Sequence, residues 1–501
     1  MDYFTEITSS PYATVLETKL LGRSMIQITS FLAIISVLYL LHIHLTKSRR
    51  SYPRDLPWVG RREGEWFADA RAHMREFSES VQNIARGYNK YGKFGKPFLT
   101  SQLTWKPEVV LPPEHIKWLI DQPDSVLSIH KVLIEDVAFN YTSPRAWDFH
   151  RPFHVEALNK INLSLITPSM VSEISLRTAS AFGTTTGEWK TAPLQHSVLS
   201  ILLGVTNRAF VGPDLAHNPA YAAATHTFIT TLLVHASRIN FATPALLKPL
   251  LGPLLALPCR RADARCRSFL EPRVRAHLAA AAAAGEADGK HGQDVLQLLA
   301  RCAVRSGSAR DRDASALASR VLALSFVGVH TSAAAAVNAL VDLLSAGPGV
   351  WAALRREAAA AALGHAEWTR AAVGRLVLLD SALRESLRFS AFKARGVERE
   401  VVARAGVVLP GGTWLPRGTK VGVPTVEVHR DGRFYERPGE FVPGRFFSAH
   451  ELKLLFAHLL LNYDFEFLDE RPESTWITDF FTYTEEIQLR VRRREKSAHL
   501  D

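Results

Sequence analysis

The feature that most constrains the fold is a long tract, from residue 114 to about 390, that is mostly helical in its pattern. Helical spacing over 66–92 and a β hairpin ended by prolines over 97–113 precede it. Residues 397–425 change to Val-rich runs separated by Pro-Gly-Gly and Pro-Arg-Gly, which predict a small sheet with tight turns. Helix returns over 448–465. The sequence therefore predicts a mainly α body with a minor β region.

The length of 501 residues alone would suggest about three domains. No Pro-, Gly- or Ser-rich linker interrupts the part of the chain after residue 66, however. We therefore expect one compact unit over 66–501.

An apolar segment near the N-terminus, MIQITSFLAIISVLYLLHIHL at 25–45, has no formally charged side chain. It matches the ~20 residues that a helix needs to cross a bilayer. Lys47, Arg49 and Arg50 come directly after it, as the positive-inside rule expects for a cytoplasmic flank. A cleaved signal peptide would have a shorter apolar run, and the remaining alternative is a buried core helix.

These patterns predict the order of the segments. Residues 1–24 would be non-cytoplasmic, 25–45 a single transmembrane anchor, and 46–65 a tether, with the body in the cytoplasm. Pro53 and Pro57 stop helix propagation, so the tether is expected to be extended and semi-rigid.

The net charge of +11 favours contact with anionic membrane lipid or with an acidic protein partner. No zinc-finger or RNA-binding motif is present, so nucleic acid is not an expected partner. The three cysteines, Cys259, Cys266 and Cys302, form no CxxC pair, and an odd count gives no disulfide framework. A reduced, cytosol-facing body fits this pattern.

Three segments carry candidate chemistry. The first is LALSFVGVHTSAAAAVNALVDLL at 322–344, an apolar helix interrupted by Gly328 and by the polar pair His330 and Thr331. A hydroxyl beside a glycine could let the helix bulge and admit a ligand. The alternative is a core helix with an incidental threonine.

The second segment is LDSALRESLRF at 379–389, in which Glu385 and Arg388 share one helix face and can pair. The surrounding leucines make this helix mostly apolar, which favours a partly buried pair that needs a further partner. The alternative is an ordinary solvated surface pair. The third segment, TVEVHRDGRFYERPGEFVPGRFF at 425–447, mixes His, Arg, Asp and aromatic residues in a loop.

Taken together, the three segments resemble the cytochrome P450 family in both order and spacing. Gly328–Thr331 resembles the family's distal helix signature, with His330 where an acid is commoner. Glu385–Arg388 resembles the ExxR pair, Leu415–Gly418 the sheet turn after it, and His429–Asp431 the next segment. The anchor with its proline tether is similar to the microsomal form, and VTNRAFVG at 205–212 resembles fungal members that oxidise terpenoid and indole-diterpene scaffolds.

The resemblance implies a cytochrome P450-like domain over 66–501, held at the endoplasmic reticulum membrane. It implies haem, NADPH supplied through a reductase docked on a basic face, and hydroxylation or oxidation of a hydrophobic secondary metabolite. It also implies roles for individual residues. Thr331, Gly328 and His330 would form the distal catalytic group; Glu385, Arg388 and Arg445 would brace the proximal side; Arg399 and His154 would meet the haem propionates.

One stretch, GEFVPGRFFSAHELKLL at 439–455, departs from the family pattern. Phe441–Phe446 satisfies the family's F-x-P-x-R-F element, yet the sequence from Pro443 onward also resembles the family's segment on the C-terminal side of the haem-ligating cysteine. The simplest account is that a few tens of residues are missing between Phe441 and Val442. Val442 would then stand at the cysteine position, and its side chain cannot ligate iron.

The incomplete proximal haem loop leaves two hypotheses. The chain is a monooxygenase whose sequence lacks an exon, or it is a catalytically inactive pseudoenzyme or scaffold. On the next helix, His450 or His458 would be the only conceivable histidine substitute for the cysteine, and the pattern does not favour such a substitute. HELKL is not a HExxH zinc site, because Leu454 occupies the position of the second histidine.

Overall fold

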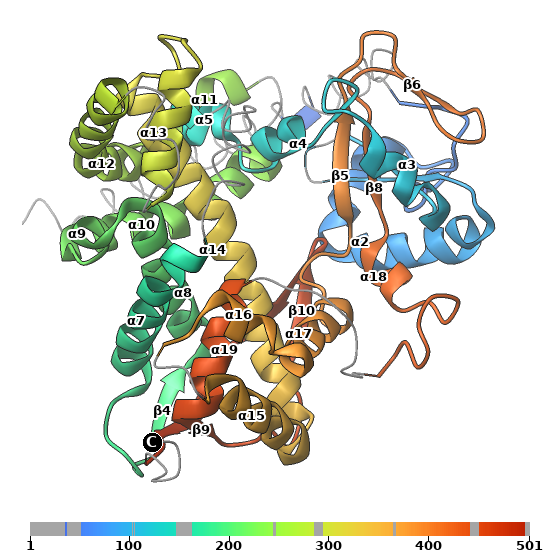
Figure 1. Cartoon of the computed structure of the whole chain (residues 1–501). Coiled ribbons are helices and arrows are strands. Elements are labelled where there is room, and N and C mark those ends of the chain that lie inside the picture. The colour runs from blue at the N-terminus through green and yellow to red at the C-terminus, as the bar shows by residue number, and fades with distance from the viewer. Residues whose placement is uncertain are drawn as a thin grey trace, which may run out of the picture.

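A helical part and a smaller sheet part make up the protein, as the computed structural model shows (Figure 1). The structure describes residues 36–37, 52–102, 104, 106–146, 163–243, 247–284, 294–363, 367–440 and 450–495. The predicted mainly α body with a minor β region is confirmed. The helices of the helical part are α7 (Leu163–Phe182), α8 (Leu194–Val211), α9 (Pro213–Ala216), α10 (Pro219–Ser237), α11 (Lys248–Leu255), α12 (Leu257–Ala284), α13 (Val295–Arg305), α14 (Ala314–Ser345), α15 (Pro348–Ala362), α16 (Arg370–Gly374), α17 (Val377–Phe389) and α19 (His450–Asn462).

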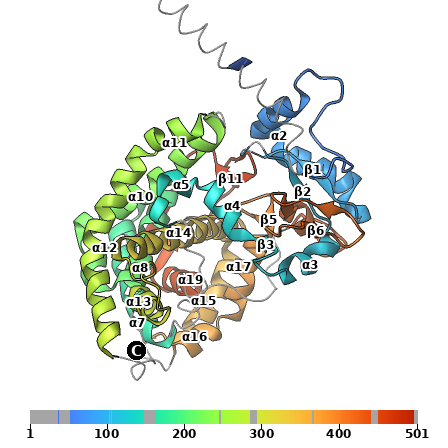
Figure 2. The same cartoon turned by 90° about the horizontal axis from the view of Figure 1, so that it is seen from above.

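Helix α14 is the central element of the helical part (Figure 2). It starts where the Asp313 carboxylate accepts a hydrogen bond from the Ala316 amide, and Gly347 and Pro348 come after its end. Its first half, up to Val329, packs with α8, α10, α12 and α13 in one apolar cluster. Its second half, from Ala333, packs with α7, α8, α15, α17 and α19 in another. Only a short interval separates the two apolar halves.

Among the described residues, α14 is also the helix that is long and apolar enough to cross a membrane. Because 61% of its most apolar window is buried inside the protein, α14 is explained as a core helix. The predicted anchor over 25–45 lies outside the described residues, apart from Ser36 and Val37.

The main sheet has the strand order β1-β2-β8-β5-β3, in which β2 and β8 run parallel and the other neighbours run antiparallel. The predicted hairpin at 97–113 is confirmed as β1 and β2, and the predicted strands at 397–425 as β5 to β8. One face of the sheet packs in an apolar cluster that includes Leu99, Val109, Val401 and Val421. The strands are β1 (Phe98–Thr100), β2 (Glu108–Val110), β3 (Leu127–Ser128), β5 (Gly396–Val401) and β8 (Lys420–Val423), with β6 (Val407–Val408) and β7 (Trp414–Leu415) as a separate pair.

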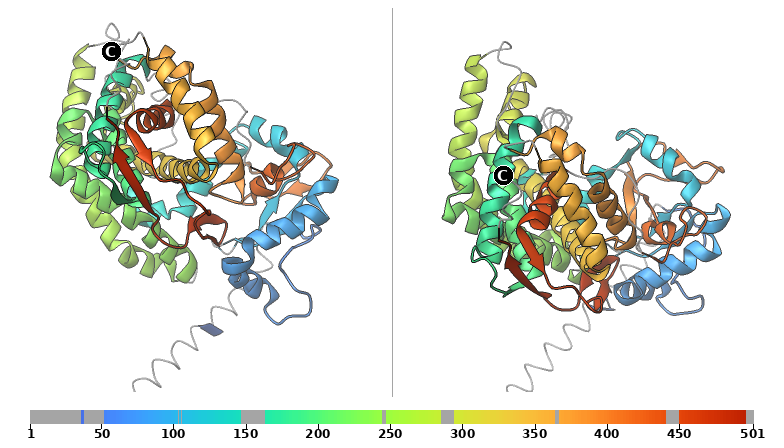
Figure 3. Two further views of the ribbon diagram at one scale, coloured as in Figure 1. Left: turned by 90° about the horizontal axis from the view of Figure 1, so that it is seen from below. Right: turned by 60° about the horizontal axis from the view of Figure 1, so that its bottom comes forward.

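The sheet part also contains α2 (Ala68–Lys90), which confirms the helix expected over 66–92. Figure 3, seen from below, shows the red C-terminal strands extending from the helical part toward the blue N-terminal helix. These strands include the hairpin β10 (Ser474–Ile477) and β11 (Phe480–Tyr483). The short connecting elements are η3 (Gly92–Phe94), η4 (Pro113–His115), α3 (Ile116–Asp121), α4 (Ile129–Asp136), α5 (Phe139–Thr142), η5 (Pro144–Ala146), η6 (Arg238–Ala242) and α18 (Thr425–His429).

One local expectation, the C-terminal end of a helix, was wrong. The helix expected over 448–465 ends at Asn462, because Tyr463–Phe465 forms strand β9 and pairs with β12 (Gln488–Arg493), whose other neighbour is β4 (Lys190–Pro193). Of the two interpretations left open for 322–344, the regular helix is the one observed: α14 is α-helical from Ala314 to Ser345, with no bulge at Gly328. The hydroxyl of Thr331 explains this regularity, because it donates to carbonyls of its own helix without displacing an amide.

Candidate functional site

The interval between the two apolar halves of α14 contains the three predicted distal residues. Thr331 is exposed, and its Oγ1 donates to the carbonyl oxygen of Val327 at 2.9 Å. A Cβ atom added at Gly328 would meet nothing within 4 Å. This side of α14 therefore faces open space at both residues, while the helix on either side of the interval is buried.

His330 lies in a different environment from Thr331. Its Nε2 is 3.1 Å from the carbonyl oxygen of Ile229 on α10, and its ring packs edge-on against Phe326. Burial lowers the pKa of His330, so the ring is neutral at physiological pH, and Nε2 carries the hydrogen that it donates to the carbonyl of Ile229. The structure thus joins His330 to α10, a partner that the sequence pattern did not indicate.

The predicted pair of Glu385 and Arg388 is present on α17 and is buried. The Arg388 Nε and Nη2 atoms donate to the two carboxylate oxygens of Glu385 at 2.8 and 2.7 Å. Three further bonds from Arg388 reach the carbonyl oxygens of His429, Pro438 and Glu440 at 2.7–2.8 Å. All five N–H groups of Arg388 are used, so this arginine fixes the loop after α18 against α17.

The remaining predicted cofactor contacts are less informative. Arg399 lies on β5 opposite Val421 and is half-buried, and its Nη1 donates to the carbonyl oxygen of its neighbour Glu398. Burial lowers its pKa, with Asp124 opposing the shift. His154, Val442 and Arg445 lie outside the described residues.

The fit to haem is good on one count and poor on another. In favour of a cofactor, α14 is open at Gly328 and Thr331, and the Glu385–Arg388 pair is complete on α17. An axial thiolate is missing, however, because Cys259 and Cys266 lie on α12 and Cys302 on α13, in the apolar cluster around the first half of α14. Both helices lie apart from α17 in Figures 1 and 2.

The cysteines are also poor ligands in themselves. Burial raises the pKa of Cys259 to about 11 and that of Cys266 to about 12, so both are neutral thiols at physiological pH. The chain contains three cysteines in all, and each of them is described. This sequence therefore offers no cysteine thiolate near Arg388.

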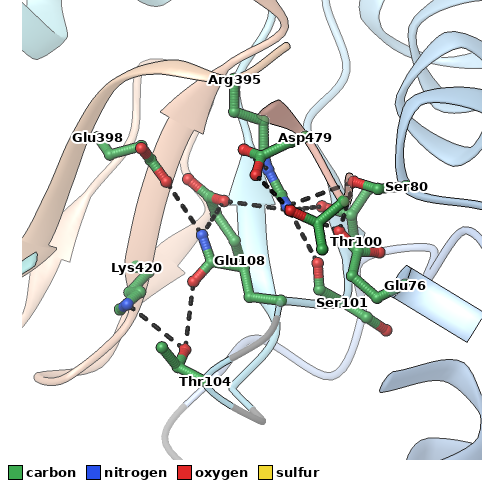
Figure 4. Close-up of polar contacts among 12 residues, drawn as sticks. Glu76, Ser80, Thr100, Ser101, Thr104, Glu108, Arg395, Glu398, Lys420 and Asp479 are labelled. Carbon is green, nitrogen blue, oxygen red and sulfur yellow. Dashed lines mark hydrogen bonds and ion pairs between the residues drawn. The ribbon is translucent and has the colours of Figure 1, made fainter. Parts of the chain in front are cut away.

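A second buried arginine, Arg395, was missed by the sequence analysis. Its Nη2 donates to Glu76 on α2 at 2.7 Å, its Nη1 to the Ser101 carbonyl at 2.8 Å, and its Nε to Asp479 in the β10–β11 turn at 3.1 Å (Figure 4). The partners are 319, 294 and 84 residues away in sequence. No short motif could have indicated them.

Comparison with known proteins identifies the family of the chain. The sequence model of the cytochrome P450 family matches residues 74–450. The chain is 29% identical to cytochrome P450 monooxygenase polB of Polytolypa hystricis, over 92% of this chain and 97% of that protein. It is 30% identical to cytochrome P450 monooxygenase ecdH of Aspergillus rugulosus, over 86% of this chain and 91% of that protein.

Solved structures show the same fold at lower identity. The haem domain of cytochrome P450DA superposes with a TM-score of 0.60 and 14% identity, covering 88% of this chain and 98% of that one. A cyanobacterial cytochrome P450 with bound retinoic acid superposes with a TM-score of 0.59 and 16% identity, covering 89% of this chain and all of the other. Membership of the family implies haem as cofactor and NADPH, supplied through a reductase, as electron source. The chain belongs to the cytochrome P450 family, and its relatives are monooxygenases of fungi.

Proposed function

We propose that this protein is a membrane-anchored monooxygenase that hydroxylates or oxidises a hydrophobic, terpenoid-like secondary metabolite in a fungal biosynthetic pathway. The observation that carries the proposal is the open face of α14 at Gly328 and Thr331. A hydroxyl and a position without a side chain, exposed between two apolar helix halves, leave room for a ligand beside a polar group. The apolar segments 125–139 and 195–260 supply the surfaces that would select a hydrophobic substrate.

The proposed roles of the residues rest on these contacts. Thr331 holds a proton at Oγ1 on the open face, and Gly328 keeps that face free of side-chain atoms. Glu385 and Arg388 hold the loop after α18 in place, with Arg445 as the expected third member. Arg399 and His154 would meet the negative charges of the cofactor, because guanidinium and imidazolium groups pair well with carboxylates.

We further propose that residues 25–45 anchor the protein in the endoplasmic reticulum membrane, with 1–24 outside the cytoplasm, 46–65 as the tether and 66–501 as the cytoplasmic domain. In support, the end of the tether is attached to the sheet: the Leu99 amide donates to the Pro57 carbonyl, and the Val59 amide to the Leu99 carbonyl, both at 2.8 Å. Protease protection of microsomes tests this topology. The sequons at Asn140 and Asn162 should stay unglycosylated, and a glycan at either would place the body in the lumen.

The alternative function is a catalytically inactive binding or scaffold protein, and the absence of a cysteine near Arg388 favours it for a polypeptide of this sequence. A missing segment is the competing explanation. The alignment with polB extends over 520 positions, more than the 501 residues of this chain, although it covers 92% of them. The chain therefore carries gaps relative to that protein.

Sequencing of cDNA across codons 430 to 450 distinguishes the two functions. An in-frame insert with a cysteine before Pro443 would support the monooxygenase, and the protein with that insert, purified with haem, should oxidise a hydrophobic metabolite when a reductase and NADPH are added. A transcript that matches the present sequence would support the inactive protein. In that case the purified chain should show no thiolate-type haem absorption.

A further inference from the structure

The polar face of the main sheet gathers more acids than bases. Salt bridges join seven carboxyl groups to only four cations between α2, the sheet, α4 and the β10–β11 turn. If every group were ionised, the cluster would be negative, which is unfavourable for its buried members. The carboxyl groups are those of Glu76, Glu108, Glu135, Asp136, Glu398, Glu400 and Asp479; the cations are Lys106, Lys393, Arg395 and Lys420.

Of the two fully buried acids in this cluster, Glu76 and Glu108, Glu108 on β2 lies farther from its nearest cation. Its side chain is fully buried, and the nearest cationic atom is Nη1 of Arg395, at 3.5 Å from Oε2. Glu76 and Asp479 approach the same guanidinium more closely, at 2.7 and 3.1 Å. The second oxygen of Glu108, Oε1, has no hydrogen-bond partner among the described residues.

The neighbour of Glu108 makes the deficit larger. The side-chain amide nitrogen of Gln102 donates to Oε2 of Glu108 at 2.5 Å and to Oε1 of Glu398 at 3.1 Å, so one amide group holds the two carboxyl groups close to each other. Two carboxylates in such an arrangement repel each other, and a proton on one of them removes the repulsion. Glu398 has Lys393 as a close partner, which leaves Glu108 as the better place for the proton.

We propose that Glu108 is a proton-binding site, occupied at neutral pH, and that loss of this proton loosens the joint between α2, the β1–β2 hairpin and β5. Burial, together with the charge of Glu398, raises the pKa of Glu108 to about 8, while Arg395, Lys393 and Lys420 oppose the shift. Burial also raises the pKa of Glu76 to about 7, although Arg395 and Ser80 oppose it. Glu76 is therefore the second acid that titrates in this joint.

The joint also holds the tether. Trp58 donates from Nε1 to the Ser101 hydroxyl at 3.2 Å, and the Nδ1 atom of His73 lies 3.0 Å from the carbonyl oxygen of Gln102. Ser101, which holds Trp58 of the tether, is thus the sequence neighbour of Gln102, whose side chain bridges Glu108 and Glu398. When Glu108 loses its proton and the joint becomes less stable, the attachment of the tether at Trp58 therefore becomes less stable too.

The direction of the pH effect is set by the raised pKa of Glu108. Between its ordinary value of 4.5 and about 8, the folded protein binds more protons at Glu108 than the unfolded chain does. Stability from this group is complete below about pH 4.5, falls as pH rises through the interval and is lost above pH 8. For one proton, the unfolding constant rises at most about tenfold per pH unit.

The test uses the full chain in detergent micelles. Urea unfolding from pH 5.5 to 9, together with hydrogen exchange of the Val59 and Leu99 amides corrected for intrinsic rates, is compared between wild type and Glu108→Gln. In the wild type, the unfolding constant should rise with pH by up to about tenfold per pH unit, and Glu108→Gln should remove this rise. The exchange rates of the Val59 and Leu99 amides should likewise stop depending on pH in the variant. The matched control, Glu466→Gln, changes an exposed partner of Arg490 and should keep the wild-type slope.

Equal slopes in wild type and Glu108→Gln would overturn the proposal. So would a failure of this variant to fold at any pH, because glutamine imitates the protonated acid. Glu398→Gln gives an independent check: without the second carboxylate the pKa of Glu108 should fall, and the pH interval should move to lower values. An unmoved interval would contradict the proposal. None of these measurements requires haem.

Discussion

Arg388 and Arg395 lie seven residues apart in sequence, are both buried and use their guanidinium groups fully, yet their surroundings differ. Arg388 faces one carboxylate, from Glu385 on the same helix, and three backbone carbonyls. Arg395 faces carboxyl groups from three other elements, those of Glu76, Glu108 and Asp479. The first site is balanced locally in charge, whereas the second is balanced only when distant parts of the chain meet. The pair within one helix can support the loop after α18 rigidly. The acids around Arg395 meet only in the folded protein, so their protonation is coupled to folding.

The largest effect is expected from Arg395→Met, which leaves three buried carboxyl groups without their shared cation. The free energy of unfolding should fall by about 3–5 kcal/mol at neutral pH, as when one partner of a buried ion pair is removed. The loss should be smaller at pH 5, where the acids can take up protons. Urea denaturation at the two pH values measures it, with Arg490→Met as the exposed control. A loss that does not depend on pH would mean that the carboxylates do not set the cost.

The effect of Arg388→Lys should be smaller. Lysine keeps the charge for Glu385 but cannot reach all three carbonyl oxygens, so buried acceptors lose their donors. We expect a loss of about 2–3 kcal/mol, with little change between pH 5 and pH 8. Arg384→Lys, at a partly exposed pair with Asp380 on the same helix, is the matched control and should cost less than about 1 kcal/mol. A pH-dependent loss at Arg388 would remove the contrast between the two arginines.

Gly422→Ala tests the close packing at Glu108. A Cβ atom at this position would lie 2.3 Å from Oε1 of Glu108 and 3.2 Å from Cγ of Glu398, so the buried carboxyl group must move. The expected cost is about 1–3 kcal/mol in urea denaturation, as for overpacking of a core. Gly374→Ala, where the added atom meets nothing within 4 Å, should be neutral or stabilising. If both substitutions behave alike, the carboxyl group is not held against Gly422.

The smallest effect is expected from Thr331→Ala. The hydroxyl of Thr331 is exposed, its bonds among the described residues stay within its own helix, and alanine is the better helix former. The free energy of unfolding, measured by thermal denaturation, should therefore change by no more than about 0.5 kcal/mol. A loss above about 1.5 kcal/mol would show that Thr331 supports the fold, and the proposal that it serves a ligand on the open face would lose its basis.

The sequence by itself determined the features that depend on nearby residues. Helical spacing predicted α2 and the tract up to α17, proline and glycine turns predicted the strands β5 to β8, and the i,i+3 spacing predicted the pair of Glu385 and Arg388. The residues in these interactions lie within one helical turn or one tight turn of each other, so their spacing along the sequence is enough to predict them. The order of the motifs likewise predicted the family.

Only the tertiary structure decided which buried groups share a charge. It joined Arg395 to Glu76 and Asp479, placed Gln102 between Glu108 and Glu398, and turned His330 toward the Ile229 carbonyl. It also ended α19 at Asn462, because β12 was available as a strand partner. Apart from the contact of Gln102 with Glu108, which spans 6 positions, these contacts join residues tens to hundreds of positions apart. Their energies depend on burial and on distance in space, and neither quantity can be obtained from the order of amino acids along one element.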